Sequence, residues 1–214
     1  MPINAPSANL SDCLVAAVSG AGSPRATPGL YRVLLRLLAC GEPITIAQLA
    51  AAAGQPVDDV RRIVSGWTDT EYDQQGRIVG WALTLNPTPH KLSIDGKQLY
   101  TWCALDTLFF PAVIGRPARV ESPCATTGAP VRLTVDPAAG VTALDPATAV
   151  VSIVTPQQMS SIRASFCDPG HFFVSRDAAS QWQARHPGME VLGVADAHRV
   201  SRPLSDTLLD EKAP

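Results

Sequence analysis

Cys103 and Asp106 lie three residues apart in an apolar segment that runs from Tyr100 to Phe110. If the segment is helical, positions i and i+3 share one face, so the thiol and the carboxyl lie within a few ångströms of each other. A thiolate is a soft nucleophile and metal ligand, and a carboxyl can carry a proton. The pair could therefore bind a soft metal and move a proton. The structural alternative is that Cys103 is a small buried side chain and Asp106 a local cap.

A second thiol, Cys167, has a similar setting among aromatic residues, just before the turn-forming residues Asp168 to Gly170. We expect Cys103 and Cys167 to meet across an apolar pocket with Asp106 beside them. Two thiolates suit a soft d¹⁰ ion that accepts few ligands, such as Hg(II) or Cu(I). A protein that only carries such an ion needs no carboxyl, so Asp106 also indicates proton transfer.

A zinc site is another possible use of these cysteines, because Cys124 and His171 would complete a Cys₃His set with them. Structural zinc ligands usually come in pairs two to four residues apart, and the five cysteines include no such pair. The spacing therefore disfavours zinc. We expect His171, between a turn and two phenylalanines, to be a packed and hydrogen-bonded residue rather than a ligand or an acid.

The composition is that of a globular protein with one large or two small domains, since 46% of the 214 residues are hydrophobic and 17% are charged. A net charge of −2 argues against a nucleic-acid partner. No apolar run is long enough to span a bilayer and no signal peptide is visible, which predicts a cytoplasmic protein without a membrane partner. Its odd number of scattered cysteines would then be reduced thiols.

The first part of the chain has the pattern of a winged helix. Helices are expected over residues 29–39, 45–53 and 57–67, followed by a hairpin over residues 71–85 that turns at residues 73–76. The third helix carries two aspartates and two arginines, a balance that is unusual in a DNA-reading helix. We therefore favour a packing scaffold over DNA binding. The predicted divisions are an N-terminal helix and linker (1–24), a winged-helix-like domain (25–86) and a catalytic domain (87–214).

The predicted catalytic domain begins after the chain break at Asn86 to Pro89 and mixes short strands with helices. Strands are expected over residues 92–94, 98–100, 118–122, 131–135, 149–154, 171–175 and 191–194. Helices are expected over residues 101–110, ending before Pro111, then over 157–165 and 177–186, with a polar C-terminal helix through Leu208. The predicted fold class is α+β, with a winged-helix-like domain joined to a mixed α/β domain of short antiparallel strands.

Several of these segments together resemble the alkylmercury (organomercurial) lyases of bacterial mercury resistance. The resemblance rests on order, spacing and flanking aromatic residues, and covers residues 30 to 195. The segments that carry it are Tyr100 to Pro111, Ile114 to Arg116, Cys124 with Thr127 to Val131, Ser165 to Cys167, His171 to Phe173, and the hairpin residues Thr70 to Asp73 and Gly80 to Leu85.

The resemblance implies residue roles. Cys103 and Cys167 match the two catalytic thiols and Asp106 the catalytic carboxyl, and these three residues would hold the Hg(II) product. Cys124 matches a buried structural cysteine. Some members have a further cysteine directly after the second catalytic thiol, but Asp168 stands there in this chain. Neither Cys13 nor Cys40 matches a family site.

The implied reaction is protonolysis of a carbon–mercury bond in small organomercurials, which yields a hydrocarbon and Hg(II) without a cofactor. Low-molecular-weight thiols, or mercuric reductase as the acceptor, are expected to remove Hg(II). An ordinary aspartate is ionised at neutral pH, and raising its pKa to about 7 would cost about 4 kcal/mol. We therefore expect Asp106 to relay a thiol proton released on mercury binding. The alternatives are a soft-metal-sensing winged-helix regulator and a thiol metal carrier.

Overall fold

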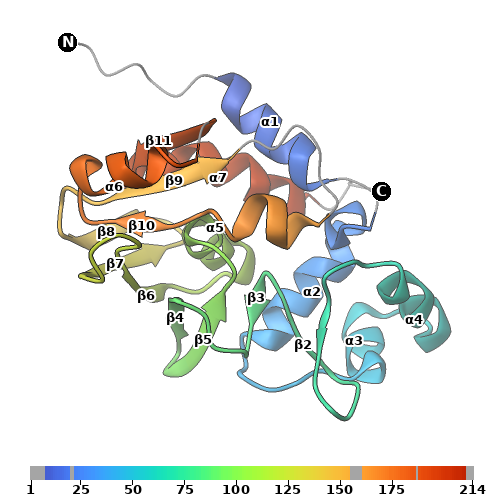
Figure 1. The fold of residues 1–214 in the computed structure, drawn as a ribbon. Helices are drawn as coiled ribbons and strands as arrows, with labels where there is room; N and C mark the ends of the chain where they lie inside the picture. The colour runs from blue at the N-terminus through green and yellow to red at the C-terminus, as the bar shows by residue number, and fades with distance from the viewer. Residues whose placement is uncertain (1–7, 20–21, 155–160, 187, 211–214) are drawn as a thin grey trace.

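The computed structural model describes residues 8–19, 22–154, 161–186 and 188–210 (Figure 1). The helices are α1 (Ala8–Val18), the 3₁₀ turn η1 (Pro24–Ala26), α2 (Pro28–Leu38), α3 (Ile46–Ala53), α4 (Val57–Ser65), α5 (Ala104–Ile114), the π-helical turn η2 (Arg163–Cys167), α6 (Arg176–Gln183) and α7 (Val194–Leu209). The strands are β1 (Glu71–Tyr72), β2 (Ile78–Trp81), β3 (Leu83–Thr84), β4 (His90–Ile94), β5 (Lys97–Thr101), β6 (Ala118–Pro123), β7 (Pro130–Asp136), β8 (Gly140–Asp145), β9 (Val150–Val154), β10 (Phe172–Phe173) and β11 (Met189–Gly193).

Helices α2, α3 and α4 lie together at one end of the molecule, next to the β1–β2 hairpin (Figure 1). Helix α3 begins in a capping box, in which the side chains of Thr45 and Gln48 each accept the backbone N–H of the other residue. It ends at Gly54, whose φ of 64° is the left-handed conformation that glycine adopts most readily. The three predicted helices are confirmed, with α4 ending two residues earlier than expected. The hairpin turns at residues 73–76 as predicted, but its second strand ends at Trp81, and β3 turns back to pair antiparallel with β2.

One antiparallel sheet of eight strands continues from the hairpin into the rest of the chain, in the order β1-β2-β3-β5-β4-β6-β7-β8. The joining point is the pairing of Leu83 and Thr84 in β3 with Thr101 and Tyr100 in β5. The sheet therefore crosses the predicted break at Asn86 to Pro89. The expected strands from residue 92 to residue 135 are confirmed, whereas β8 was not anticipated.

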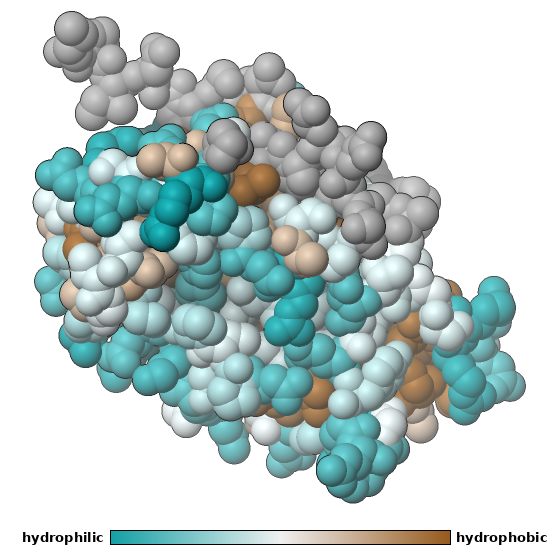
Figure 2. All heavy atoms as spheres, viewed as in Figure 1, coloured by the Kyte–Doolittle hydropathy of each residue, from teal (hydrophilic) through white to brown (hydrophobic). Residues whose placement is uncertain are grey.

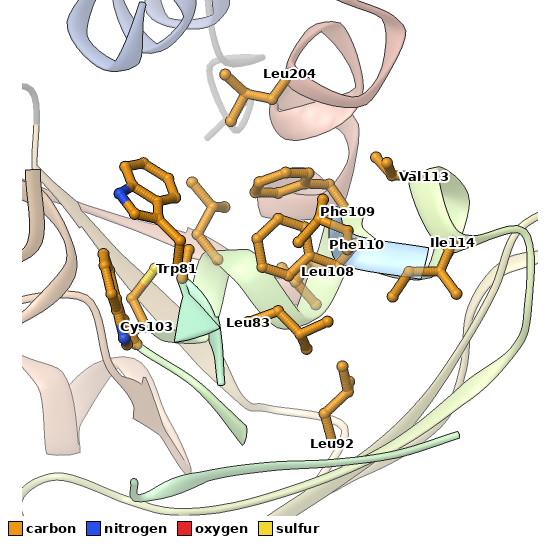
Figure 3. Packing of buried hydrophobic residues seen from close by; sticks show 14 of the residues in the cluster. Trp81, Leu83, Leu92, Cys103, Leu108, Phe109, Phe110, Val113, Ile114 and Leu204 are labelled. Carbon is orange, nitrogen blue, oxygen red and sulfur yellow. The ribbon is translucent and has the colours of Figure 1, made fainter. Parts of the chain in front are cut away.

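Helix α5 lies at the centre of the fold, and ten of its eleven residues are buried. The prediction of a helix over residues 101–110 is wrong at both ends, because Thr101 belongs to β5 and the helix continues through Pro111 to Ile114. A proline inside a helix costs about 3 kcal/mol. Burial on all sides outweighs that cost here, and Figure 3 shows Leu108 and Phe110 of this helix in one apolar cluster with residues of other elements, such as Leu83 of β3.

A second sheet has three strands in the order β10-β9-β11. Helix α6 packs against this sheet, and α7 follows β11 directly in the chain. The predicted helix over residues 157–165 falls partly outside the described residues, and its described remainder is the π-helical turn that ends at Cys167. The strand expected over residues 171–175 is shorter than predicted. Helix α7 confirms the predicted C-terminal helix and buries one face against α5 and α1.

In the described parts of the chain, no helix has both the length and the apolar character needed to cross a membrane. The face of the molecule in Figure 2 is mainly hydrophilic, with hydrophobic residues in separate spots rather than in one broad patch.

Candidate active site

The first turn of α5 holds Cys103 and Asp106 in reciprocal contact. Cys103 is the N-cap residue, and its sulfur accepts the backbone N–H of Asp106. In return, the Asp106 carboxylate accepts the Cys103 backbone N–H at 3.3 Å. A helix N-terminus favours negative charge, so it stabilises a thiolate at this position. The local capping role and the chemical role are therefore compatible, and the same geometry provides both.

Cys167 reaches this pair from the end of η2. Its Sγ lies 3.9 Å from Oδ2 of Asp106, and one ligand atom from each of Cys103, Asp106 and Cys167 lies within 4.8 Å of the others. All three residues are at most 2% exposed. Across the described ranges, this is the only group of at least three Cys, His, Asp or Glu residues close enough to share a metal ion.

The close approach of the two thiol-bearing segments depends on Gly170. Its carbonyl accepts the Ala104 N–H at 2.9 Å, and its own N–H donates to the Cys167 carbonyl at 2.8 Å. A Cβ at this position would lie 3.0 Å from Cβ of Cys103 and 3.2 Å from the Cys167 oxygen. Both distances are shorter than most Cβ contacts, so glycine is the residue that allows this approach without a shift of its neighbours. The sequence showed only a turn here and gave no sign of that contact.

Burial and the hydrogen bonds within the cluster set the pKa values of all three groups. It raises the pKa of Asp106 to about 6, although hydrogen bonding with Cys103 and the charge of Arg25 oppose the increase. Burial also raises the pKa of Cys103. The hydrogen bond with Cys103, followed by burial, raises the pKa of Cys167 well above its ordinary value. At neutral pH the resting site therefore holds mainly protonated thiols beside a carboxylate that is mostly ionised.

Arg25 in η1 brings a positive charge towards this site from the N-terminal part of the chain. Its guanidinium lies 5.0 Å from the centre of the Phe109 ring and 5.8 Å from that of Tyr31. Its Nε and Nη1 atoms are buried and have no hydrogen-bond partner among the described residues. The positive charge of Arg25 opposes the increase in the pKa of Asp106 and of Cys167, but it does not cancel that increase. Sequence reasoning missed Arg25, since nothing nearby in the chain marks it.

Cys124 lies apart from the three clustered residues. It is 2% exposed and packs with Val150, Phe173 and Ala179. Burial raises its pKa, but hydrogen bonds led by that of Thr126 outweigh burial and bring the value to about 7. The position agrees with the predicted structural role and not with a Cys₃His zinc site. Cys13 and Cys40 are exposed thiols.

His171 is a packed residue, as expected. Its ring stacks on His90 with centroids 5.8 Å apart and meets Trp182 edge-on at 4.8 Å. Its backbone N–H donates to Ser152 Oγ at 2.9 Å. None of these contacts brings the imidazole into the thiol and carboxyl cluster.

Comparisons with known proteins agree on one family. The sequence model of alkylmercury lyase matches residues 83–206, and that of the helix-turn-helix domain of alkylmercury lyase matches residues 9–82. Over 205 residues the chain is 53% identical to an alkylmercury lyase of Streptomyces lividans, and the matched region covers 96% of this chain and 95% of the relative. Over 185 residues it is 52% identical to that of Bacillus cereus, covering 86% and 84%. Over 194 residues it is 43% identical to that of Pseudomonas putida, covering 91% of each.

A solved structure has the same fold. The crystal structure of the mercury-bound form of MerB2 superposes with a TM-score of 0.78 and 21% sequence identity, covering 94% of this chain and 100% of that chain. The likeness of the sequence segments around Cys103, Cys124 and Cys167 therefore extends over almost the whole chain. With relatives more than 40% identical over nearly their full length, the chain belongs to the alkylmercury lyase family.

Proposed function

We propose that this protein is an organomercurial lyase that cleaves the carbon–mercury bond of small organomercurials by protonolysis. The observation that carries the proposal is the convergence of two thiols and one carboxyl in a buried cluster. Mercury is a soft ion that thiolates bind tightly, and the leaving carbanion needs a proton. The cluster supplies the groups for both steps. Membership of the alkylmercury lyase family supports the same function.

In the first step, Cys103 captures the substrate R–Hg–X and releases HX, leaving R–Hg–S–Cys103. Cys103 is the better first nucleophile because its sulfur lies at the N-terminus of α5 and accepts an N–H there, which stabilises its thiolate. The pKa of Cys167 is raised further, since this thiol is hydrogen-bonded to Cys103. Cys167 therefore remains a thiol until mercury arrives.

In the second step, mercury binds the Cys167 sulfur and makes its proton acidic. Asp106 takes that proton, because its Oδ2 is the carboxylate oxygen next to the sulfur. The protonated carboxyl then delivers the proton to carbon, and the electrons of the carbon–mercury bond form the new C–H bond. The products are R–H and Hg(II) held by two thiolates, with the Asp106 carboxylate restored. Mercury stays divalent throughout, so no electron donor is needed.

The acidity of Asp106 suits a relay better than a stored proton. With a pKa of about 6, the carboxyl carries a proton in only a minority of molecules at neutral pH. It can accept a proton when mercury acidifies the thiol and can give it up in the next step, since its pKa is close to the working pH.

We further propose that Hg(II) leaves by thiol exchange. Two buried thiolates hold the ion too tightly for rapid unaided release, so two low-molecular-weight thiols, or the cysteines of mercuric reductase, would accept it and return protons to the cysteines. No resident cofactor has a role in these steps. A reducing cytoplasm would provide the thiols and keep the five cysteines from forming disulfides.

The regulator alternative is not favoured, because the relatives are alkylmercury lyases over nearly the whole chain, helix-turn-helix part included. The charges of α4 also pair within the helix, Arg61 with Asp58 and Arg62 with Asp59. Helix α4 therefore lacks the excess of positive charge that a helix in contact with a nucleic-acid backbone usually carries. A simple mercury carrier would need no proton relay at Asp106.

The proposal is tested by measuring methane released from methylmercury in excess thiol. Cys103→Ser and Cys167→Ser should each lower turnover at least a hundredfold, because a serine hydroxyl is a poor mercury ligand. Cys40→Ser is the matched control, since Cys40 is exposed and lies outside the cluster, and its turnover should equal that of the wild type. Near-normal turnover in either cluster variant would refute the two-thiol mechanism.

A further inference from the structure

The segment that carries Cys167 is attached to the N-terminal part of the chain through Asp69, which lies between α4 and β1. The Asp69 carboxylate accepts the Ser161 hydroxyl at 3.0 Å and the backbone N–H of Ile162 at 3.1 Å. It also accepts the backbone N–H of Arg163 at 3.5 Å. These groups begin the helical turn that ends at Cys167, so the carboxylate caps that turn from another part of the chain.

Asp69 adopts an unfavourable backbone conformation to do this. Its φ is 62°, in the left-handed region, which side chains seldom allow, which Asp and Asn tolerate better than most residues, and which glycine adopts most readily. Such strain persists where surrounding contacts hold it, and it often marks a functional position. Glycine would fit the backbone at residue 69 with less strain. The contacts that require an aspartate are those of its carboxylate with residues 161–163.

Glu71 makes a second connection, and this one reaches both thiol-bearing segments. Its Oε1 accepts the Trp102 indole N–H at 3.2 Å and also the Arg163 guanidinium. Trp102 directly precedes Cys103, and Arg163 lies one turn before Cys167. The Arg163 guanidinium also lies 4.9 Å from the centre of the Trp102 ring, so the two partners of Glu71 touch each other.

The rest of the Glu71 carboxylate is fixed within the N-terminal part. Its Oε2 accepts the Thr84 hydroxyl and the Asn86 amide, the latter at 3.1 Å. The side chain is only 13% exposed. Space for it comes from Gly80, where a Cβ would lie 2.6 Å from this oxygen. The carboxylate is therefore anchored on one side and joined to the active-site segments on the other.

We propose that Asp69 and Glu71 are positioning residues that set the approach of Cys167 to Cys103, so that the helix-turn-helix part of the chain belongs functionally to the active site. This inference rests on the proposed lyase function. Neither carboxylate touches the reacting groups, and each acts through the segment that it holds. A displacement of about 1 Å can lower turnover a hundredfold, so loss of either anchor has a catalytic effect even when the fold survives.

The sharpest test is Asp69→Gly, because glycine relieves the backbone strain while removing the carboxylate. If the residue only forms a turn, the variant is as active as the wild type. We expect instead a ten- to hundredfold lower kcat, with the organomercurial bound to one thiol and uncleaved, which intact-protein mass spectrometry detects as an added R–Hg mass. Asp69→Asn keeps one acceptor and should fall between the two.

Asp95→Gly is the matched control, because Asp95 also has a positive φ (48°). This variant loses only an exposed ion pair, the one with Arg116. Its kcat should stay within twofold of the wild type. Hydrogen exchange gives a readout independent of turnover, and the amides of Ile162 and Arg163 should exchange at least tenfold faster in Asp69→Gly. Glu71→Gln should likewise lower kcat while the thermal transition remains cooperative.

The outcomes separate the two proposals. A wild-type protein that releases no hydrocarbon refutes the lyase function. If the wild type is active and Asp69→Gly is equally active, the positioning role is refuted and the lyase function stands. The same holds if the amides of Ile162 and Arg163 exchange with solvent at the same rate in Asp69→Gly as in the wild type. If the glycine variant fails to fold, Asp69→Asn provides the comparison, and wild-type kcat in that variant overturns the inference.

Discussion

The sulfur of Cys167 lies 3.9 Å from Oδ2 of Asp106, although the two residues are 61 positions apart in the chain. The two side chains come from η2 and from the first turn of α5, and both are buried. Cys167 is the donor and the carboxylate the acceptor in this contact, which is at the long end of hydrogen bonds that involve sulfur. The thiol proton therefore faces the carboxylate that we propose as its acceptor.

Asp106→Asn should separate mercury binding from cleavage. Both thiols remain, so the variant should still bind Hg(II) and capture an organomercurial, but an amide cannot relay a proton. Loss of such an acid–base group typically lowers turnover by a factor of about 10² to 10⁴. Asp168→Asn is the control, because Asp168 directly follows Cys167 but is exposed, and it should retain activity. Full cleavage by Asp106→Asn would remove the relay role.

Asp106→Asn should also make the protein more stable than the wild type at high pH. The folded-state pKa of Asp106 is about 6, above its ordinary 3.8, so the folded chain binds the proton more tightly than the unfolded chain does. Stability is therefore lost as pH rises from 4 to 6, by up to about 3 kcal/mol. Asparagine has no such loss. Urea unfolding should show Asp106→Asn more stable than wild type at pH 8 and nearly equal at pH 4; equal stability at both pH values would contradict the burial effect.

Gly170→Ala should push apart the two thiol-bearing segments. The added methyl would meet Cβ of Cys103 and the Cys167 carbonyl closer than ordinary packing allows. We expect at least a tenfold loss of methane release and an unfolding free energy lower by about 1 to 3 kcal/mol. Gly29→Ala is the control, since a Cβ there has open space in a helix and should be neutral or stabilising. Unchanged turnover in Gly170→Ala would show that the contact is not limiting.

His90 should make the fold sensitive to acid. Burial, aided by the neighbouring His171, lowers the pKa of His90 from 6.5 to about 3. Between these pH values the unfolded chain binds a proton that the folded chain excludes, so stability falls as pH drops, by up to about 4 kcal/mol at pH 3. His90→Asn should show a shallower fall between pH 6.5 and pH 4 in urea unfolding. Parallel curves for the two proteins would exclude this contribution.

Local patterns predicted most of the secondary structure. Thr45 and Gly54 mark the ends of α3 because capping needs only neighbouring residues. The turn at residues 73–76 and the strand pair around Asp95 and Gly96 follow from equally local preferences. Helix α5 was misplaced because its extent depends on burial from all sides, which overrides the local signal of Pro111.

The three clustered side chains were predictable, whereas their supports were not. Cys103, Asp106 and Cys167 stand out by residue type and aromatic surroundings. Gly170 and Asp69 act through contacts with distant segments, and an aspartate or a glycine in a turn looks ordinary in sequence. Such roles become visible only when the fold brings the segments together.

Protonolysis itself is tested most directly by running the wild-type reaction on methylmercury in D₂O and analysing the headspace gas by mass spectrometry. Both thiols and the carboxyl exchange with solvent before the reaction, so the relay from Cys167 through Asp106 should place one deuterium on carbon. The predicted product is CH₃D, formed in step with Hg(II). Unlabelled methane, or no methane from folded protein in excess thiol, would contradict the mechanism.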